Sequence, residues 1–294
     1  MVTRSPLLNV MIRAADRAAR GLKRDFGEVE NLQVSRKGPA DFVSAADLKA
    51  EGILREELHK ARPDYGFLME ESGARAGKAG SDRCWIVDPL DGTSNFLHGL
   101  PHFAISIGLT EAKQVIAGVV YDPIKEELFY AEKGGGAYLN DRRMRVSGRG
   151  RLDDALLATG IPYKGHGSTA QFGRELDQAM QATAGVRRWG TASLDLAYVA
   201  AGRFDGFWER DLAPWDIAAG LLLVREAGGY VTAIDGEAVR LDGRSILAAN
   251  DSLHGKLVAL FAAADTEAAP DASPEAETRS EHGPSGTRPS GEAA

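Results

Sequence analysis

The sequence predicts an α+β fold of layered helices and sheets, and three observations support this prediction. Helical periodicity opens the chain, several short strand-like runs follow, and a mixed pattern of helices and strands fills the part beyond residue 150. No internal sequence repeat is present. Helices and strands that alternate in this way bury their apolar faces in packed layers. These patterns leave the order of the strands open.

The first half of the chain contains two helical patterns and then a series of strands. Residues 5–24 and 45–61 each place apolar side chains on one helical face. The face of the second helix comprises Leu48, Ile53, Leu54 and Leu58. The strand-like runs are residues 66–69, 85–87, 104–110, 115–121 and 128–131. Glycine and proline turn signals separate several of them.

The second half begins with a strand near residues 155–158 and a helix near 170–181. A further helix follows Gly190-Thr191-Ala192 and runs to about residue 201, and a strand covers 204–208. The last predicted helix runs from 214 to 227. It has proline in its first turn and two glycines after its end, which are favourable residues for starting and stopping a helix.

We expect one folded domain over residues 1–263, made of two intimate subdomains with a boundary near residue 150, and a disordered acidic tail over 264–294. The tail has no large apolar side chain, so it cannot offset its chain entropy by burial. It carries seven acidic residues and two arginines, which is −5 of the net charge of −7. The nearly neutral remainder gives no electrostatic footprint for direct binding of nucleic acid.

Composition excludes several classes of protein. The single cysteine, Cys84, rules out an internal disulfide framework and a thiolate metal cluster, and its apolar neighbours favour a buried side chain. No targeting segment is visible, and no run approaches the roughly 20 apolar residues of a membrane span. We therefore expect a cytoplasmic protein with no membrane partner.

Three separated segments place carboxylates directly after apolar runs. Glu70-Glu71 follows Phe67-Leu68-Met69, Asp88-Pro89-Leu90-Asp91 follows Trp85-Ile86-Val87, and Asp216 follows Pro214-Trp215. An apolar strand that ends in an acidic residue delivers that residue to the edge of a sheet. Each segment also has a simpler interpretation, because Glu70-Glu71 could be a solvated pair and Asp216 could cap the helix that starts at Pro214.

The middle segment is the most informative. Because Pro89 cannot continue a regular strand or helix, we expect a bend that turns Asp88, Asp91 and the carbonyl of Leu90 toward one point. Such hard oxygen donors suit Mg²⁺. Gly92 lets a phosphate approach the backbone, and the N–H groups that open the following short helix can bind it.

Two alternatives apply to this segment. Asp91-Gly92 can be a plain turn with Asp88 as a cap. The haloacid-dehalogenase signature also contains an Asp-Gly-Thr, but it has an Asp-x-Asp spacing near the N-terminus. Here the spacing is Asp88-x-x-Asp91, far inside the chain, so this alternative is weak.

Together these segments resemble the three signature motifs of the inositol monophosphatase family. The resemblance covers residues 5–263 and includes 39–47 and 202–209. It implies a layered α-β-α-β-α sandwich, a homodimer, two or three Mg²⁺ ions per subunit and inhibition by lithium. Residues 1–263 would then form an inositol-monophosphatase-like catalytic domain.

The resemblance also implies roles for individual residues. Glu70, Asp88 and the Leu90 carbonyl would hold one Mg²⁺, and Asp88, Asp91 and Asp216 a second. Glu70 and Thr93 would position and activate the attacking water, and Asp47 would support Thr93. The implied substrate-binding residues are Asp91, Gly92, Thr93, Gly190, Ala192, Glu209 and Asp216. Pairing of Glu209 with Arg210 is the alternative to a substrate role.

The implied reaction is hydrolysis of a small phosphate monoester by direct in-line attack of a metal-activated water, with no phosphoenzyme. Myo-inositol monophosphate is the favoured substrate among phosphorylated polyols. The alternatives are 3'-phosphoadenosine 5'-phosphate, fructose 1,6-bisphosphate and histidinol phosphate. Some bacterial members of the family instead contact RNA polymerase or elongation factors, so a transcription-related role also stays open.

Three further residues have other interpretations. His98 and His102 are expected to have surface or structural roles rather than to bind a metal. Arg188, with its neighbours Arg187 and Trp189, favours a dimer interface over an RNA-binding patch.

Overall fold

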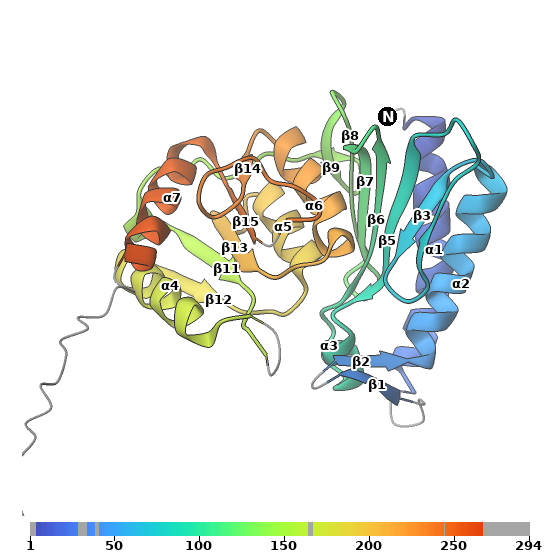
Figure 1. Ribbon diagram of the computed structural model, residues 1–294, viewed down its shortest axis with the longest axis horizontal. Helices are drawn as coiled ribbons and strands as arrows, with labels where there is room; N and C mark the ends of the chain where they lie inside the picture. The colour runs from blue at the N-terminus through green and yellow to red at the C-terminus, as the bar shows by residue number, and fades with distance from the viewer. Residues whose placement is uncertain (1–3, 29–33, 39–40, 164–166, 244, 267–294) are drawn as a thin grey trace, which may run out of the picture.

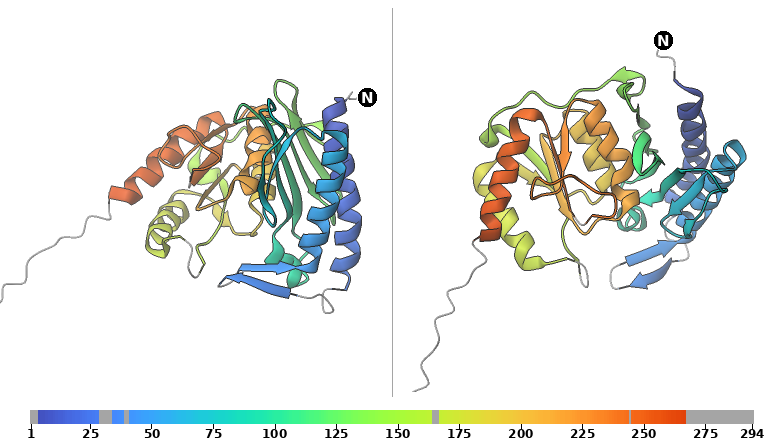
Figure 2. Two further views of the ribbon diagram at one scale, coloured as in Figure 1. Left: turned by 45° about the vertical axis from the view of Figure 1, so that its right-hand side comes forward. Right: turned by 45° about the horizontal axis from the view of Figure 1, so that its top comes forward.

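The computed structural model describes residues 4–28, 34–38, 41–163, 167–243 and 245–266. Five layers follow one another across the molecule (Figure 1). Two long helices cover one face of a large sheet, two central helices lie between this sheet and a smaller one, and two further helices cover the outer face of the small sheet. The rotated views show the same succession (Figure 2). The predicted layered α-β-α-β-α fold is confirmed.

The outer pair of helices is α1 and α2, the central pair is α5 and α6, and the opposite pair is α4 and α7; α3 is a short helix at the lower end of the large sheet (Figure 1). Their bounds are α1 Pro6–Phe26, α2 Ala45–Ala61, α3 Thr93–Leu97, α4 Thr169–Ala182, α5 Ala192–Ala200, α6 Pro214–Glu226 and α7 Asp251–Thr266. α1 starts where Ser5 caps it, because the Ser5 side chain accepts a hydrogen bond from the Leu8 N–H at 3.1 Å.

The large sheet has eight strands in the order β10-β9-β8-β7-β6-β5-β3-β4. Their bounds are β3 Gly66–Met69, β4 Gly73–Arg75, β5 Arg83–Asp91, β6 Ala104–Glu111, β7 Gln114–Asp122, β8 Glu127–Glu132, β9 Gly136–Leu139 and β10 Arg142–Arg143. All neighbouring pairs are antiparallel except β3 and β5. That parallel pair sets two strand ends side by side.

The small sheet has five strands in the order β12-β11-β13-β15-β14. Their bounds are β11 Leu156–Thr159, β12 Gly185–Arg187, β13 Gly206–Arg210, β14 Tyr230–Thr232 and β15 Ser245–Ala249. A separate hairpin pairs β1 Val34–Gly38 with β2 Asp41–Ser44.

Helix α6 lies unusually close to the large sheet. Gly108 of β6 and Gly118 of β7 are cross-strand partners beneath it. A Cβ atom on Gly118 would lie only 2.9 Å from the carbonyl oxygen of Ala219. Because these two positions lack side chains, the helix can lie directly on the strands. The Ser106 hydroxyl of β6 also donates a hydrogen bond of 3.1 Å to the Trp215 carbonyl in the first turn of α6. This contact places the first turn of α6 next to the strand that carries Asp88.

Most predicted elements are present with ends shifted by a few residues, but two details were wrong. Leu48 does not belong to the buried face of α2, because its side chain is 58% exposed, whereas Leu54 and Leu58 are fully buried. The strand does not end at Pro89, since β5 continues to Asp91. The irregular register between Asp88 and Asp91 is a β-bulge, which is where a sheet tolerates proline.

The expected subdomain boundary near residue 150 falls between β10 and β11, and therefore between the two sheets. Helix α7 extends to Thr266, three residues past the expected end of the folded part. The remainder of the expected tail, residues 267–294, lies outside the described residues. Among the described helices, none has the length and apolarity needed to cross a bilayer.

Candidate functional site

The parallel pairing of β3 and β5 brings the first two predicted acidic residues together. Met69, the last residue of β3, pairs with Val87 of β5, so Glu70 and Asp88 follow at the same edge of the sheet. The Glu70 N–H donates to the Val87 carbonyl at 3.2 Å and extends this pairing by one residue. Glu70 therefore directly follows the end of its strand, as expected, whereas Asp88 lies inside β5, three residues before that strand ends.

The bulge and the turn after it fix the next group of residues. Asp88 accepts a hydrogen bond from the Leu90 N–H at 2.9 Å, which shapes the turn around Pro89. The hydroxyl of Thr93, at the start of α3, lies 3.0 Å from an oxygen of Asp47 and 3.0 Å from the Leu90 carbonyl. Asp47 is fully buried in the first turn of α2. The predicted contact between Asp47 and Thr93 is therefore present.

Glycine is required at position 92. Its φ of +95° lies in the left-handed region, and it immediately precedes α3. A Cβ atom there would lie 2.6 Å from the Thr191 hydroxyl oxygen. Glycine at this position therefore lets the turn after β5 pack closely against Thr191, the residue before α5.

The third acidic segment reaches the same place from α6. Asp216 is in the first turn of that helix, and one of its carboxylate oxygens accepts the Ala213 N–H at 2.7 Å. The capping interpretation is thus correct for one oxygen. The charge of Asp216 nevertheless acts on Asp88, so capping and membership of the acidic group occur together.

Electrostatics show how close the four acidic residues are. Burial raises the pKa of Asp88 well above its ordinary value, and the negative charges of Glu70, Asp91 and Asp216 raise it further. Burial likewise raises the pKa of Asp216, followed by the charge of Asp91. Burial raises the pKa of Asp91 to about 6, although hydrogen bonds from Ser193 oppose the shift. Carboxyl groups on which neighbouring negative charges act in this way form a site suited to a cation.

The donor set fits a hard divalent cation. Asp88, Asp91 and Asp216 each have one oxygen held by a backbone N–H group, at 2.7–2.9 Å, which orients the carboxylate and leaves its second oxygen for a cation. Among the described residues, no three His, Cys, Asp or Glu side chains are close enough to chelate an ion as they stand.

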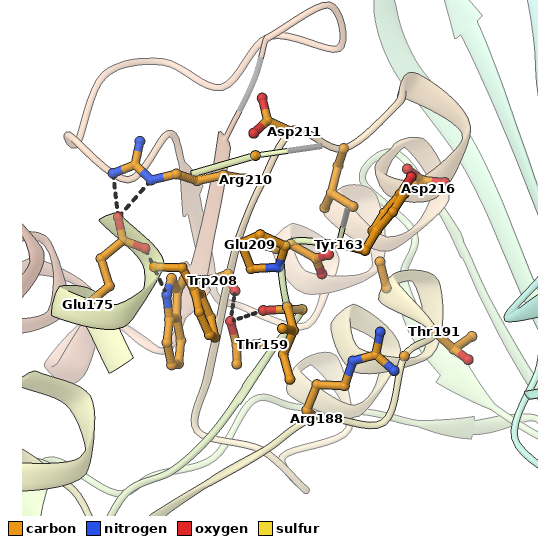
Figure 3. A pocket seen from close by; sticks show the side chains of 18 of the residues that line it. Thr159, Tyr163, Glu175, Arg188, Thr191, Trp208, Glu209, Arg210, Asp211 and Asp216 are labelled. Carbon is orange, nitrogen blue, oxygen red and sulfur yellow. Dashed lines mark hydrogen bonds and ion pairs between the residues drawn. The ribbon is translucent and has the colours of Figure 1, made fainter. Parts of the chain in front are cut away.

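A cavity of about 220 Å³ opens beside the acidic group (Figure 3). Asp91 and Asp216 lie on its wall, and so do Gly190, Thr191 and Ala192, which precede and begin α5. The Ser193 N–H of α5 donates to Asp91 at 2.7 Å, so the start of this helix is tied to the acidic group. The predicted substrate-binding positions Gly190 and Ala192 are thus in contact with the same cavity.

Glu209 also lines this cavity, and Gly160 provides the space for it. A Cβ atom on Gly160 would lie 1.8 Å from a Glu209 carboxylate oxygen. Burial, followed by the charge of Asp91, raises the pKa of Glu209 to about 8, although the charge of Arg188 opposes the shift. Arg210 binds Glu175 instead, with its Nε 2.6 Å from the Glu175 Oε1. Because side chains alternate along β13, Glu209 and Arg210 point to opposite faces.

Sequence reasoning missed several residues of the site. Glu51 is buried and accepts the Glu71 N–H at 2.8 Å and the Ser72 N–H at 3.2 Å, so it holds the segment that carries Glu70. Glu51 lies four residues after Asp47 on α2, so both fall on one helical face, and this spacing was the sequence signal that could have identified Glu51. Arg188 lines the cavity, a position that the dimer-interface interpretation did not anticipate. Asp195 is also buried nearby, and its Oδ1 has no hydrogen-bond partner among the described residues.

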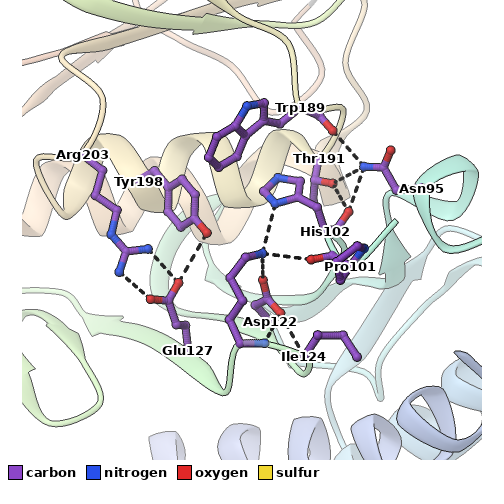
Figure 4. Close-up of polar contacts among 11 residues, drawn as sticks. Asn95, Pro101, His102, Asp122, Ile124, Glu127, Trp189, Thr191, Tyr198 and Arg203 are labelled. Atoms are coloured by element: carbon purple, nitrogen blue, oxygen red, sulfur yellow. Dashed lines mark hydrogen bonds and ion pairs between the residues drawn. The ribbon is translucent and has the colours of Figure 1, made fainter. Parts of the chain in front are cut away.

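Polar contacts behind the site connect α3 with the turn that follows it and with the segment before α5 (Figure 4). Asn95 donates to the carbonyls of His102 and Trp189, both at 2.8 Å. The His102 ring packs edge-on against Trp189. Burial, followed by the charge of Lys125, lowers the pKa of His102 to about 4, so the ring is neutral near pH 7. These contacts agree with the structural role expected for His102.

Known proteins match this chain over nearly its whole length. Residues 3–266 match the inositol monophosphatase family. An inositol-1-monophosphatase of Rhizobium meliloti is 59% identical over 252 residues, which cover 86% of this chain and 94% of that protein. A Nus factor SuhB of Pseudomonas aeruginosa is 44% identical over 248 residues, with 83% and 92% of the two chains covered.

A solved structure gives the same result. The crystal structure of the extragenic suppressor protein suhB from Bartonella henselae matches with a TM-score of 0.84 and 55% sequence identity, and the match covers 87% of this chain and 98% of that one. The chain therefore belongs to the inositol monophosphatase family of phosphoric monoester hydrolases.

Proposed function

We propose that this protein hydrolyses myo-inositol monophosphate to myo-inositol and phosphate with the help of Mg²⁺. The observation that carries the proposal is the electrostatic coupling of Glu70, Asp88, Asp91 and Asp216 beside a cavity that contains Glu209. The inositol-1-monophosphatase of Rhizobium meliloti, 59% identical, supports the choice of substrate.

Two or three Mg²⁺ ions per subunit would be held by these carboxylates. Glu70, Asp88 and the Leu90 carbonyl suit one ion, and Asp88, Asp91 and Asp216 suit a second. When bound, the ions neutralise phosphate charge, lower the pKa of the attacking water and stabilise the leaving alkoxide. Lithium is expected to inhibit the enzyme.

The side chains around the cluster orient the reactants. Glu70 and Thr93 would position the attacking water, and Asp47 fixes the Thr93 hydroxyl through the 3.0 Å contact. The backbone N–H groups of Gly92 and Thr93, at the start of α3, would bind the phosphate. No dedicated nucleophilic aspartate is required, so water attacks phosphorus directly. Covalent phosphate on the protein after a quench with labelled substrate would contradict this step.

The sugar would lie in the cavity next to α5 and β13. Glu209 would accept hydrogen bonds from substrate hydroxyls, and Gly190 and Ala192 line the same cavity. Each such hydrogen bond contributes about 0.5–1.5 kcal/mol when the carboxyl group is neutral and about 1.5–3 kcal/mol when it is ionised. Glu209 therefore favours a polyol phosphate over 3'-phosphoadenosine 5'-phosphate.

Gly160→Ala should raise KM for inositol monophosphate about tenfold or more while changing kcat less. The new methyl group would take the place of the Glu209 carboxylate, whose flexible side chain can move without unfolding the protein. Glu209→Gln should have the same effect, and steady-state kinetics measures both. Gly173→Ala on α4 is the matched control, because a Cβ there meets nothing within 4 Å. Unchanged KM in both variants would remove Glu209 from substrate binding.

A panel of phosphate esters assayed with Mg²⁺, with and without lithium, tests the proposed function. We expect inositol monophosphate to have the highest kcat/KM and lithium to inhibit its hydrolysis. Preference for 3'-phosphoadenosine 5'-phosphate, fructose 1,6-bisphosphate or histidinol phosphate would reassign the substrate. Absence of hydrolysis for every ester would contradict the proposal.

We further propose a cytoplasmic homodimer. Leu100 and Trp189 are 52% and 40% exposed, and such apolar side chains suit a subunit interface. Light scattering should give about twice the chain mass of 31.4 kDa. A monomer at micromolar concentration would contradict this assignment, and fractionation of cells would test the location.

A second candidate function is contact with the transcription machinery. It is supported by the relative named Nus factor SuhB, which is 44% identical. Pull-down with RNA polymerase and elongation factors would test it. If a catalytically inactive Asp88→Asn variant restored the phenotype of a deletion strain, the binding role would dominate.

A further inference from the structure

An arginine-lined cavity of about 490 Å³ lies away from the candidate active site. It is formed by Leu139, Asn140, Arg142, Arg143, Met144, Arg145, Ala201 and Arg203. We refer to it as the arginine pocket. We propose that the arginine pocket binds a small anion that carries two or more linked phosphate groups.

The backbone that carries three of these arginines is firmly held. Met144 is buried and its N–H donates to the Ala137 carbonyl at 2.8 Å, so the chain is fixed between Arg143 and Arg145. The segment also touches the loop after α5, because a Cβ on Gly202 would lie 3.0 Å from the Arg145 carbonyl oxygen. This close contact brings Arg203 beside the other arginines.

One of the guanidinium groups is held in place before any ligand binds, and a second packs against the backbone. Arg203 donates to Glu127 at 2.7 Å and lies 4.6 Å from the centre of the Tyr198 ring (Figure 4). The Arg143 guanidinium lies against Gly136, within 3.1–3.2 Å of the position that a Cβ would occupy. Groups that are already ordered lose less entropy when a ligand binds.

The positive charge of the pocket is largely unneutralised. Glu127 is paired with Arg203, and Asp141 is paired with Arg4 at 2.6 Å. Within the described parts of the chain, Arg142, Arg143 and Arg145 form no ion pair. The next arginines of the same segment differ, because Arg149 binds Asp205 at 3.2 Å and Arg151 binds aspartates beside it. Positive charge is therefore concentrated at the pocket rather than spread along the segment.

Phosphate chemistry suits this arrangement. The planar guanidinium fork binds phosphate oxygens through paired hydrogen bonds, and several forks around one hollow favour more than one phosphate group. The volume lies within the range of roughly 300–1,000 Å³ that is typical of small-molecule sites. None of the described residues that line the pocket is aromatic, so it offers no aromatic ring on which a nucleobase could stack. These features favour a small polyphosphate over single-stranded RNA.

The arginine pocket and the candidate active site lie at opposite ends of α5. Ser193, near the start of this helix, donates to Asp91, whereas Ala201 and Arg203 follow its end. A helix of this length spans about 13 Å. The pocket is therefore separate from the proposed metal cluster and can be tested without metal.

Inorganic triphosphate is the probe for this test. Isothermal titration at about 0.15 M salt, with protein stripped of metal on a chelating resin, should give one binding site per chain. Stripping the metal removes the cations through which the carboxylate cluster could bind the probe. The double variant Arg142→Gln, Arg145→Gln should bind at least tenfold more weakly. Both side chains are exposed, and circular dichroism would check that the fold is kept.

The matched control is the double variant Arg151→Gln, Arg240→Gln. It removes the same amount of positive charge, but each of its arginines is already paired with aspartate. We expect its affinity to stay within twofold of that of the unmodified protein. An equal loss in both double variants would reduce the effect to net charge and overturn the proposal, and so would a lack of saturable binding by the unmodified protein. Tighter binding of a single-stranded RNA through the same two arginines would assign the pocket to nucleic acid instead.

Discussion

Asp88→Asn should lower kcat for inositol monophosphate by about 10³-fold or more while the protein stays folded. Asp88 is shared by both proposed ion sites, so its loss removes a ligand charge from each, and a few kcal/mol of lost stabilisation corresponds to this factor. The asparagine side-chain carbonyl can still accept the Leu90 N–H, so the turn around Pro89 should persist. Steady-state kinetics at saturating Mg²⁺ measures the effect.

The same substitution should stabilise the metal-free protein. It removes a buried carboxyl group whose pKa is raised by burial and by the negative charges of Glu70, Asp91 and Asp216. Its thermal midpoint without metal should therefore rise, and added Mg²⁺ should stabilise it less than the unmodified protein. Asp177→Asn, at an exposed position on α4, is the control and should change neither property. An Asp88→Asn variant that kept a tenth of the activity would contradict the proposed role.

Metal-free protein should become less stable as the pH rises from about 5 to about 8. Burial raises the pKa of Asp91 to about 6 and that of Glu209 to about 8, whereas both groups titrate near 4 in the unfolded chain. Between these values the folded state keeps protons that the unfolded state has released. A rise in pH therefore favours unfolding, and the stability present below about pH 4 is lost as the pH passes the folded-state pKa values.

The thermal midpoint should fall by at least about 5 °C across this range, since each kcal/mol corresponds to roughly 2–4 °C in a protein of this size. Added Mg²⁺ should reverse the trend and stabilise the protein more at pH 8 than at pH 5, because the cation binds the ionised carboxylates. Asp91→Asn should flatten the metal-free curve, whereas Glu56→Gln, an exposed position on α2, should leave it unchanged. If the thermal midpoint of the metal-free protein did not change with pH, the raised pKa values of Asp91 and Glu209 would be contradicted.

Local sequence patterns pointed to the acidic residues, but the family motifs were needed to join them into one site. Glu70 and Asp88 directly follow apolar runs, and Glu70 comes immediately after β3, whereas Asp88 lies within β5. For Asp216, helix-start chemistry favoured capping, and its place in the site came from the family motif. The contact between Asp47 and Thr93 came from the family resemblance alone, because no local pattern links residues 46 positions apart.

Residues whose role depends on long-range packing could not be predicted. Asp195 and Arg188 reach the acidic site through the placement of α5 and the segment before it, which follows from how this helix packs against α6. Pro89 was expected to end its strand, but pairing with β6 on the other side of the bulge keeps the chain in the sheet. Leu48 fits an apolar helical face by spacing, yet α2 turns a face toward the core that carries Asp47 and Glu51.

The central proposal is that Glu70, Asp88, Asp91 and Asp216 hold divalent cations together. Anomalous diffraction from crystals soaked in Mn²⁺, which binds the same oxygen ligands as Mg²⁺, tests it most directly. We predict at least two Mn²⁺ peaks, each within about 2.0–2.6 Å of carboxylate oxygens from this group, with Asp88 touching both. Peaks confined to other parts of the surface, or none near Asp88, would contradict the claim.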